Sequence, residues 1–153
     1  MKKLFFALAV LFALPFWGNS QSINWMSFEE AIKLNEQAPR KILVDVYTDW
    51  CGWCKKMDSD TFTNETVINY INEHFYAVKF NAETEDTIIF NHKMYVKDGR
   101  INTLTIKLLG DEIAYPAYVA LDENNKVIYR KLGYMDADTF MSKLRAIVNR
   151  KTE

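Results

Sequence analysis

Two cysteines directly after an apolar run constrain this chain more than any other feature. Residues 42–47 form a nearly continuous apolar run that is rich in β-branched side chains. Such a run is typical of a strand buried on both faces of a parallel or mixed sheet. Cys51 and Cys54, the only two cysteines among 153 residues, follow within a few positions. The pattern predicts a buried strand that leads into a helix beginning at the cysteine pair.

The segments around this strand alternate between helical and strand-like patterns. Ser27 and Glu30 form a capping box, which predicts a helix over 28–37 that ends before Pro39. Residues 101–109 fit a strand and a helix alike, and Gly110 as a C-cap favours the helix. The other expected elements are helices over 64–74 and from Asp136 onwards, a hairpin over 87–96, and strands over 76–81, 117–121 and 126–132. This order predicts an α/β fold, a three-layer sandwich with the sheet between helices.

The first twenty residues are typical of an export signal. Lys2 and Lys3 precede an apolar run over 4–17, and small residues follow at 18–20. The run is shorter than the about 20 residues that a membrane-spanning helix needs. We therefore expect a signal peptide over 1–20 and one domain over 21–153, exported to the periplasm. An uncleaved N-terminal membrane anchor is the alternative.

Charge and cysteine usage exclude several classes of partner and scaffold. The chain has 19 basic and 20 acidic residues, and removal of Lys2 and Lys3 leaves 17 against 20, a net charge of −3. This balance gives no reason to expect nucleic acid or an anionic membrane as partner. Two neighbouring cysteines do not make the disulfide framework of a small secreted scaffold. The number and placement of the cysteines predict one local dithiol in an exported protein.

The spacing of the cysteines suits reversible disulfide formation. Residues i and i+3 share one face of a helix about 5–6 Å apart, and a disulfide needs Cα atoms about 4.4–6.8 Å apart. In the first turn of a helix, unpaired N–H groups and the helix dipole stabilise a thiolate. We expect Cys51 to be the exposed nucleophile and Cys54, one turn inward, to resolve the mixed disulfide.

Three other interpretations of the cysteine pair are weaker. A zinc site needs further ligands at close spacing, and the only histidines, His74 and His92, lie far downstream. Haem attachment needs a histidine after the second cysteine, where Lys55 stands. A structural disulfide across so short a loop gains little loop-closure entropy. A redox-active pair without a metal ion is the favoured interpretation.

The stretch from Val44 to Met57 resembles the active-site strand and helix of the thioredoxin superfamily. It is most similar to the exported thioredoxin-like proteins with a WCGWCK motif, and the resemblance covers most of 27–148. It implies a central mixed sheet flanked by helices, and thiol–disulfide exchange. The chain departs from the family in two places. Gly-Trp lies between the cysteines where the family's shorter members have Gly-Pro or Gly-His, and 87–110 is expected to be an insertion before Pro116.

The resemblance also implies roles for residues outside the cysteine pair. Asp45 matches the buried acid that relays a proton to or from the inner cysteine, and Lys79 matches the lysine that pairs with it. Burial should raise the pKa of Asp45, because a charged carboxylate is costly to desolvate. The alternative is a carboxylate at a strand end that faces water. Pro116 matches the family's cis-proline, which presents backbone to the substrate chain, and bulky Tyr115 before it is expected to narrow or redirect substrate choice.

Two tryptophans flank the expected nucleophile, and each has two interpretations. Their rings could form an apolar contact surface for an extended partner, or they could pack against the fold. We expect Trp50 to pack as a roof over the site and Trp53 to be partly exposed. The candidate substrate-binding residues are Trp50, Gly52, Trp53, Tyr115 and Pro116.

The resemblance and the residue patterns together predict a periplasmic thiol–disulfide oxidoreductase that reduces disulfides in exported proteins. It is expected to need no bound cofactor, because the dithiol carries both electrons. Its expected partners are cysteine-containing exported proteins and a membrane thiol electron carrier that resets the site. Two alternatives stay open, since fold alone does not define function. One is a thioredoxin-like binding module without redox turnover, and the other is an oxidase or isomerase.

Overall fold

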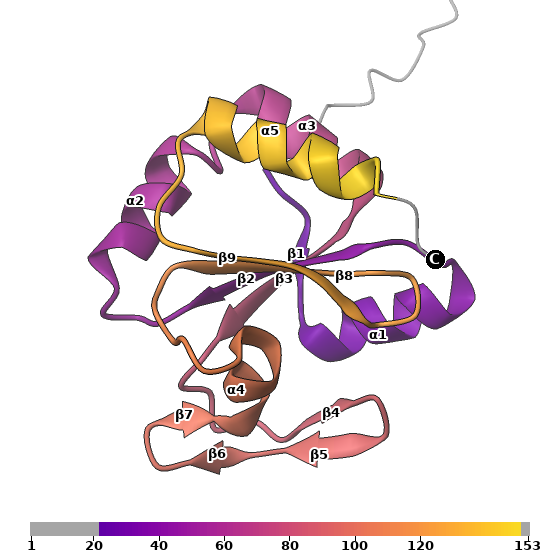
Figure 1. The fold of residues 1–153 in the computed structure, drawn as a ribbon, viewed down its shortest axis with the longest axis vertical. Coiled ribbons are helices and arrows are strands. Elements are labelled where there is room, and N and C mark those ends of the chain that lie inside the picture. Colours follow the sequence, from indigo (N-terminus) through magenta and orange to yellow (C-terminus); the bar gives the residue numbers. More distant parts are fainter. Residues whose placement is uncertain (1–21, 151–153) are drawn as a thin grey trace, which may run out of the picture.

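The computed structural model describes residues 22–150, so the predicted signal peptide over 1–20 lies outside the described residues. A five-stranded sheet forms the centre of the molecule (Figure 1). In their order across the sheet, its strands are β1 (Trp25–Met26), β3 (Tyr76–Asn81), β2 (Ile42–Tyr47), β8 (Ala117–Leu121) and β9 (Val127–Leu132). β3 runs parallel to both β1 and β2, whereas β8 pairs antiparallel with both β2 and β9. The sheet is therefore mixed, as predicted.

Helices cover both faces of the sheet and give the predicted three layers (Figure 1). The helices on one face are α2 (Gly52–Asp60), α3 (Glu65–His74) and α5 (Ala137–Val148), and those on the other are α1 (Phe28–Gln37) and α4 (Thr103–Leu109). Each face has its own apolar cluster. Leu43 belongs to the cluster under α3 and α5, and its neighbours Ile42 and Val44 belong to the cluster over α1 and α4. This alternation confirms that β2 is buried on both faces.

Local sequence signals place the helix ends where they were expected. The side chain of Ser27 accepts a hydrogen bond from the N–H of Glu30 at 3.2 Å, and the Glu30 carboxylate accepts one from the N–H of Ser27 at 2.8 Å. This capping box starts α1, which ends at Ala38. Asp136 caps α5 by accepting from the N–H of Thr139 at 2.8 Å. The predicted helix over 28–37 and the strands over 42–47, 76–81 and 117–121 are confirmed.

The segment between β3 and β8 begins with the predicted hairpin, formed by β4 (Ile88–Phe90) and β5 (Lys93–Tyr95). Asn91 and His92 make its two-residue turn with φ angles of 49° and 61°. This left-handed region is one that asparagine and histidine enter more readily than most residues. The side chain of Phe90 is buried in the cluster over α1 and α4, so the hairpin is anchored to the main core.

A second, shorter ribbon follows, formed by β6 (Lys97–Asp98) and β7 (Ile101–Asn102), and α4 continues from it. The helix expected over 101–109 is confirmed for 103–109 and wrong for 101–102. The reason is Asn102, which ends the ribbon and caps α4 by accepting from the N–H of Leu104 at 3.0 Å. Gly110 ends the helix with a φ of 81°, as its C-cap role predicts.

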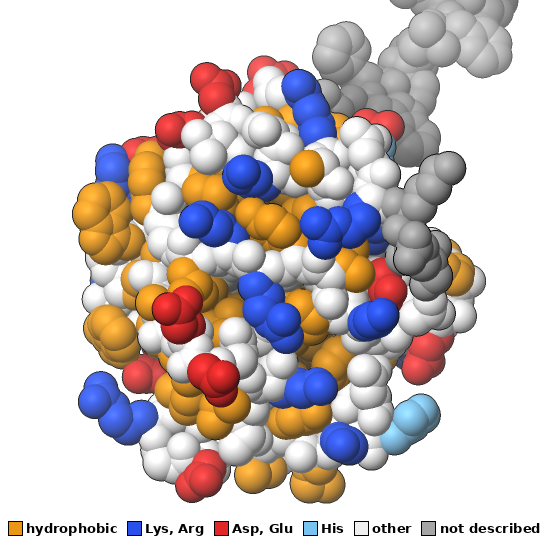
Figure 2. Space-filling view, in the orientation of Figure 1, with side chains coloured by type: hydrophobic (Ala, Val, Ile, Leu, Met, Phe, Trp, Pro, Cys, Tyr) orange, Lys and Arg blue, Asp and Glu red, His pale blue; other side chains and the backbone are white. Residues whose placement is uncertain are grey.

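The outer strand β9 leaves one edge of the sheet unpaired, because no strand of the described chain follows it in the sheet order. It carries the exposed cations Arg130 and Lys131. Figure 2 shows several Lys and Arg side chains across the middle of the face drawn there. Charges on an edge strand oppose pairing with the sheet of another molecule.

Candidate functional site

The cysteine pair lies at the start of α2, directly after β2 and a short turn. Cys51 is the N-cap of α2 and is joined to Cys54 by a disulfide, with the two Cα atoms 5.3 Å apart. The backbone N–H of Cys54 donates a hydrogen bond to Sγ of Cys51 at 3.1 Å. Sγ of Cys51 therefore occupies the place of a capping oxygen. In that place the helix N–H groups and the helix dipole stabilise a thiolate after reduction.

Both cysteines are nearly inaccessible in this disulfide form. Cys51 is 5% exposed and Cys54 is 3% exposed. The prediction of an exposed Cys51 is therefore wrong for the oxidised protein. Cys54 shares the buried side of α2 with Met57, three residues further on, and the disulfide ties Cys51 to that side. The two cysteines differ in their place in the helix, and hardly in their accessible area.

Asp45 of β2 is buried and paired with a lysine. The parallel register places it beside Lys79 of β3, and Nζ of Lys79 lies 2.7 Å from Oδ2 of Asp45. The other oxygen, Oδ1, is buried and has no hydrogen-bond partner within the described part of the chain. Asp45 is 2% exposed. It is therefore not the water-facing carboxylate of the alternative interpretation.

Burial raises the pKa of Asp45 to about 6 from an ordinary value of 3.8. The ion pair with Lys79 acts to lower this pKa, but the loss of hydration outweighs it. For Lys79, burial acts to lower the pKa, and the carboxylates of Asp45 and Asp58 together outweigh burial, so the pKa is raised. Near neutral pH, Asp45 can therefore exchange a proton while Lys79 stays charged.

Asp58 of α2 is a third member of this group, and the sequence interpretation missed it. Nζ of Lys79 also contacts Oδ1 of Asp58. Asp58 follows Cys54 by four residues, so the two side chains lie on one side of the helix. That spacing is the signal in the sequence that points to it. The Lys79 ammonium group also lies 5.1–5.2 Å from the ring centroids of Trp25, Tyr47 and Phe62.

Two aromatic pairs flank the disulfide. The ring centroid of Trp50 lies 6.0 Å from that of Tyr115, and the indole N–H donates to Glu83 at 3.0 Å. The ring of Trp53 lies 5.7 Å from that of Tyr134. Trp50 is 62% exposed and Trp53 60% exposed. The expected exposure of Trp53 is confirmed. The expected packing of Trp50 as a roof is wrong, because Glu83 and Tyr115 hold its ring at the surface without covering it.

The peptide bond between Tyr115 and Pro116 is cis. The backbone oxygen of Pro116 accepts from the N–H of Gly133 at 2.8 Å, which holds this turn against the chain after β9. The contact between Tyr115 and Trp50 brings the cis-proline turn beside the turn that carries Cys51. Gly52 between the cysteines is exposed, and a Cβ atom there would meet no other atom within 4 Å. The backbone at Gly52 is therefore open to an approaching chain.

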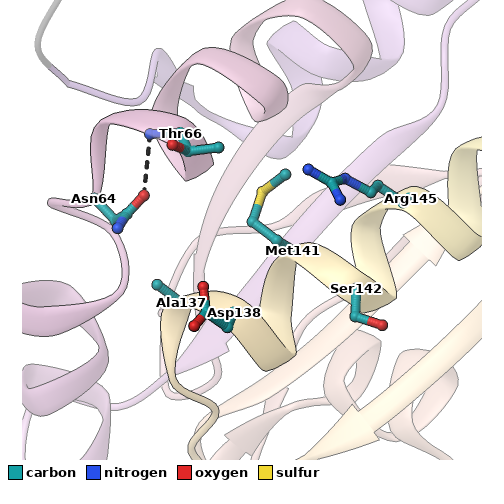
Figure 3. A pocket seen from close by; sticks show the side chains of 7 residues that line it. All are labelled: Asn64, Thr66, Ala137, Asp138, Met141, Ser142 and Arg145. Atoms are coloured by element: carbon teal, nitrogen blue, oxygen red, sulfur yellow. Dashed lines mark hydrogen bonds between the residues drawn. The ribbon is translucent and has the colours of Figure 1, made fainter.

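A cavity of about 420 Å³ lies between α3 and α5 (Figure 3). Asn64 lines it and caps α3 by accepting from the N–H of Thr66 at 3.0 Å. Met141 and Arg145 of α5 line its other side. None of the predicted site residues lines this cavity. The cysteine pair, and not the cavity, is the candidate functional site.

Within the described part of the chain, the histidines and the acidic residues do not gather into a metal site. Over residues 22–150, no three or more His, Cys, Asp or Glu side chains are placed to hold a metal ion together. His74 stacks near Tyr70 with ring centroids 4.3 Å apart, and His92 is exposed in the turn between β4 and β5. Across the same stretch, no helix combines the length and apolar character that crossing a bilayer requires.

A mixed sheet between helices, with a CxxC disulfide at the start of α2 and a cis-proline beside it, defines a thiol–disulfide oxidoreductase of the thioredoxin class. The chain belongs to the thioredoxin-like domain family, whose profile matches residues 28–147. The resemblance to the thioredoxin superfamily and the predicted thioredoxin fold are thereby confirmed.

Two solved structures and one curated protein illustrate the relationship. A thioredoxin from Thermus thermophilus has a TM-score of 0.65 at 17% identity, over 84% of this chain and 88% of that one. A protein from Bacteroides thetaiotaomicron, provisionally assigned as a disulphide isomerase, has a TM-score of 0.61 at 26% identity, over 86% and 95%. The thiol:disulfide interchange protein DsbD of Ralstonia nicotianae is 27% identical over 121 residues, which are 76% of this chain and 17% of that protein. This chain is thus similar to a small part of DsbD.

Proposed function

We propose that this protein is an exported oxidoreductase that reduces disulfides in cysteine-containing exported proteins. The observation that carries the proposal is the position of Cys51 Sγ as the N-cap acceptor of α2, 3.1 Å from the N–H of Cys54. This position lowers the cost of a negative charge on Cys51. It makes Cys51 the attacking thiolate of the reduced protein.

The exchange proceeds in two steps. The Cys51 thiolate attacks one sulfur of the partner's disulfide, a mixed disulfide forms, and the partner's other sulfur leaves as a thiolate that takes up a proton from water. The Cys54 thiol then gives its proton to Asp45, and the Cys54 thiolate attacks Sγ of Cys51. The sulfur of the partner that was bound to Cys51 leaves as a thiolate that takes up a proton from water, Asp45 releases its proton to water, and the pair closes to the disulfide seen here. Two electrons have passed from the dithiol to the partner.

Asp45 is the proton acceptor of the second step. Its pKa of about 6 lets it receive a proton near neutral pH, which a carboxylate at its ordinary value of 3.8 does poorly. Its buried oxygen Oδ1 accepts no hydrogen bond from the described residues and is open to a proton. Between turnovers, the ion pair with Lys79 stabilises the deprotonated carboxylate of Asp45 inside the fold.

The partner chain docks on the surface formed by Trp50, Gly52, Trp53, Tyr115 and Pro116. The two exposed indole rings offer apolar area on either side of the disulfide. The open backbone at Gly52 and the cis-proline turn, whose Tyr115 ring contacts Trp50, admit an extended chain. The ring of Tyr115 occupies the place next to the proline and narrows this surface.

We infer the reducing direction from the residues between the cysteines. A stabilised thiolate makes a dithiol pair more oxidising, and Trp53 offers no charge for that stabilisation. The helix terminus alone suits a thiol pKa near 7, as in thioredoxin itself. We expect a potential nearer to thioredoxin's, about −270 mV, than to DsbA's, about −120 mV. A membrane thiol carrier would then keep the pair reduced in an oxidising compartment, and the similarity to part of DsbD supports a connection of this kind.

Equilibration with glutathione buffers tests the direction. A potential near −270 mV would support the reductase, and one above about −180 mV would indicate an oxidase or isomerase. Insulin reduction with dithiothreitol tests turnover itself, because a binding module without redox activity would give equal rates for the wild type and Cys51→Ser. Mass spectrometry of the protein recovered from the periplasm tests export, since cleavage after residue 20 predicts a mature chain that starts at Gln21.

A further inference from the structure

Lys79 is shared by two carboxylates from different layers of the fold. Its Nζ atom lies 2.7 Å from Oδ2 of Asp45 on β2 and also contacts Oδ1 of Asp58 on α2. The side chain of Asp45 is 3% exposed, whereas that of Asp58 is 46% exposed. The three groups form a row of carboxylate, ammonium and carboxylate that runs from the sheet to the surface of the helix. The one ammonium group of Lys79 is therefore paired with two carboxylates.

The position of Lys79 does not depend on Asp58 alone. Its ammonium group lies near three aromatic rings, and the ion pair with Asp45 holds it from the sheet side. The rings belong to Trp25, Tyr47 and Phe62. Because none of these contacts involves Asp58, we expect Lys79 to stay beside Asp45 when Asp58 is changed. Loss of the Asp58 charge then acts on Asp45 through electrostatics.

Asp58 and Lys79 are the charged groups that act on Asp45 among residues 22–150. Lys79 favours the charged carboxylate of Asp45, and Asp58 disfavours it by repulsion. Two other titratable groups lie around this row, Tyr47 of β2 and Tyr118 of β8. Asp49 acts electrostatically on Tyr47, and Tyr134 acts on Tyr118. Burial raises the pKa of Tyr47 and of Tyr118, so both stay neutral over the range in which Asp45 titrates.

We propose that Asp58 is a positioning residue of the dithiol site, which shares Lys79 with Asp45 and thereby sets the pH at which Asp45 takes up a proton. If Asp58 were neutral, the Lys79 ammonium group would form an ion pair with Asp45 alone. Asp45 would then stay deprotonated down to a lower pH. The role of Asp45 as acceptor for the Cys54 proton belongs to the proposed function, and the importance of Asp58 for exchange rests on it. Asp58 acts on the exchange only through Lys79 and Asp45.

Carboxyl carbon NMR of the oxidised protein measures the midpoint of the Asp45 titration directly, with the signal assigned by its loss in Asp45→Asn. Asp58→Asn keeps the size of the side chain and one acceptor oxygen, and removes the charge. We expect the midpoint to fall by about half to one pH unit, the effect of a partly screened neighbouring charge. Asp58→Glu keeps the charge and should leave the midpoint near the wild-type value.

Asp60→Asn is the matched control, because Asp60 lies on the same helix and pairs with Lys56 instead of Lys79. It should leave the Asp45 midpoint unchanged. An unchanged or higher midpoint in Asp58→Asn, or equal shifts in Asp58→Asn and Asp60→Asn, would overturn the inference. The pH dependence of mixed-disulfide resolution is the second readout and should shift downwards with the midpoint. If the midpoint shifts and the resolution profile does not, the inference about Asp58 stands and the proton-accepting role of Asp45 falls.

Discussion

Sγ of Cys51 accepts a hydrogen bond from the backbone N–H of Cys54 at 3.1 Å, although the two residues are almost equally buried. The bond places the Cys51 sulfur at the positive end of α2, whereas Cys54 lies on the buried side. We therefore expect iodoacetamide to alkylate Cys51 at least about tenfold faster than Cys54 in the reduced protein at neutral pH, the effect of one pKa unit on the thiolate fraction. Timed quenching and peptide mass spectrometry measure the two rates.

Trapping of partner proteins gives an independent check of the order in which the two cysteines react. Cys54→Ser lacks the resolving thiol and should accumulate mixed disulfides, whereas Cys51→Ser should not. Faster labelling of Cys54, or trapping by Cys51→Ser, would contradict the assignment of Cys51 as nucleophile.

The stability of the protein should depend on pH through Asp45. Its proton is bound more tightly in the folded protein, where the pKa is about 6, than at the ordinary value of 3.8. The stability that this proton contributes is therefore full below about pH 4 and is lost as the pH rises through about 6. Over that window the wild type should lose about 3 kcal/mol of unfolding free energy relative to Asp45→Asn. Urea unfolding of both proteins across the window measures the difference.

Asp45→Asn should therefore be more stable than the wild type above neutral pH, since Lys79 keeps a carboxylate partner in Asp58. The same variant should resolve mixed disulfides more slowly, because the amide that replaces the carboxylate cannot accept the Cys54 proton. A variant that is less stable at every pH and exchanges at the wild-type rate would show that Asp45 has only a structural role.

Trp53 should matter for partner recognition and little for folding. Its ring is 60% exposed, so Trp53→Ala should change the unfolding free energy by no more than about 0.5 kcal/mol. The loss of apolar contact area should raise KM for a protein disulfide several-fold and leave exchange with a small disulfide unchanged. Steady-state kinetics with insulin and with a small aromatic disulfide separate the two effects. Ile89→Ala is the control, because Ile89 is also 60% exposed but lies on β4; an equal rise in KM there would argue against a docking role for Trp53.

The side chain at position 53 should also control the redox potential of the Cys51–Cys54 pair. A histidine between the cysteines carries positive charge that stabilises the Cys51 thiolate, and the neutral indole ring does not. Trp53→His should therefore raise the potential by at least about 30 mV, equivalent to 1.4 kcal/mol. Glutathione equilibria of both proteins at one pH give the two potentials. An unchanged or lower potential would mean that the side chain at this position does not act on the thiolate.

Much of the secondary structure could be predicted because its causes are local. The capping box of Ser27 and Glu30 spans three residues, and it marks the start of α1 without help from the rest of the chain. The apolar run over 42–47 marks β2 in the same way, since a strand buried on both faces needs apolar residues at nearly every position. The spacing of Cys51 and Cys54 likewise defines the disulfide, because three residues of one helical turn bring the sulfurs together.

The environment of Trp50 and the part played by Asp58 were decided only by the tertiary structure. The ring of Trp50 stays at the surface because Glu83 and Tyr115, distant in the sequence, hold it there. Asp58 joins the ion pair because α2 packs over β3, where Lys79 lies 21 residues further along the chain. Sequence patterns record which residues are neighbours along a helix or strand. Burial, ion pairing and the pKa of Asp45 depend on which distant segments meet, and those contacts form only when the sheet and its helices pack together.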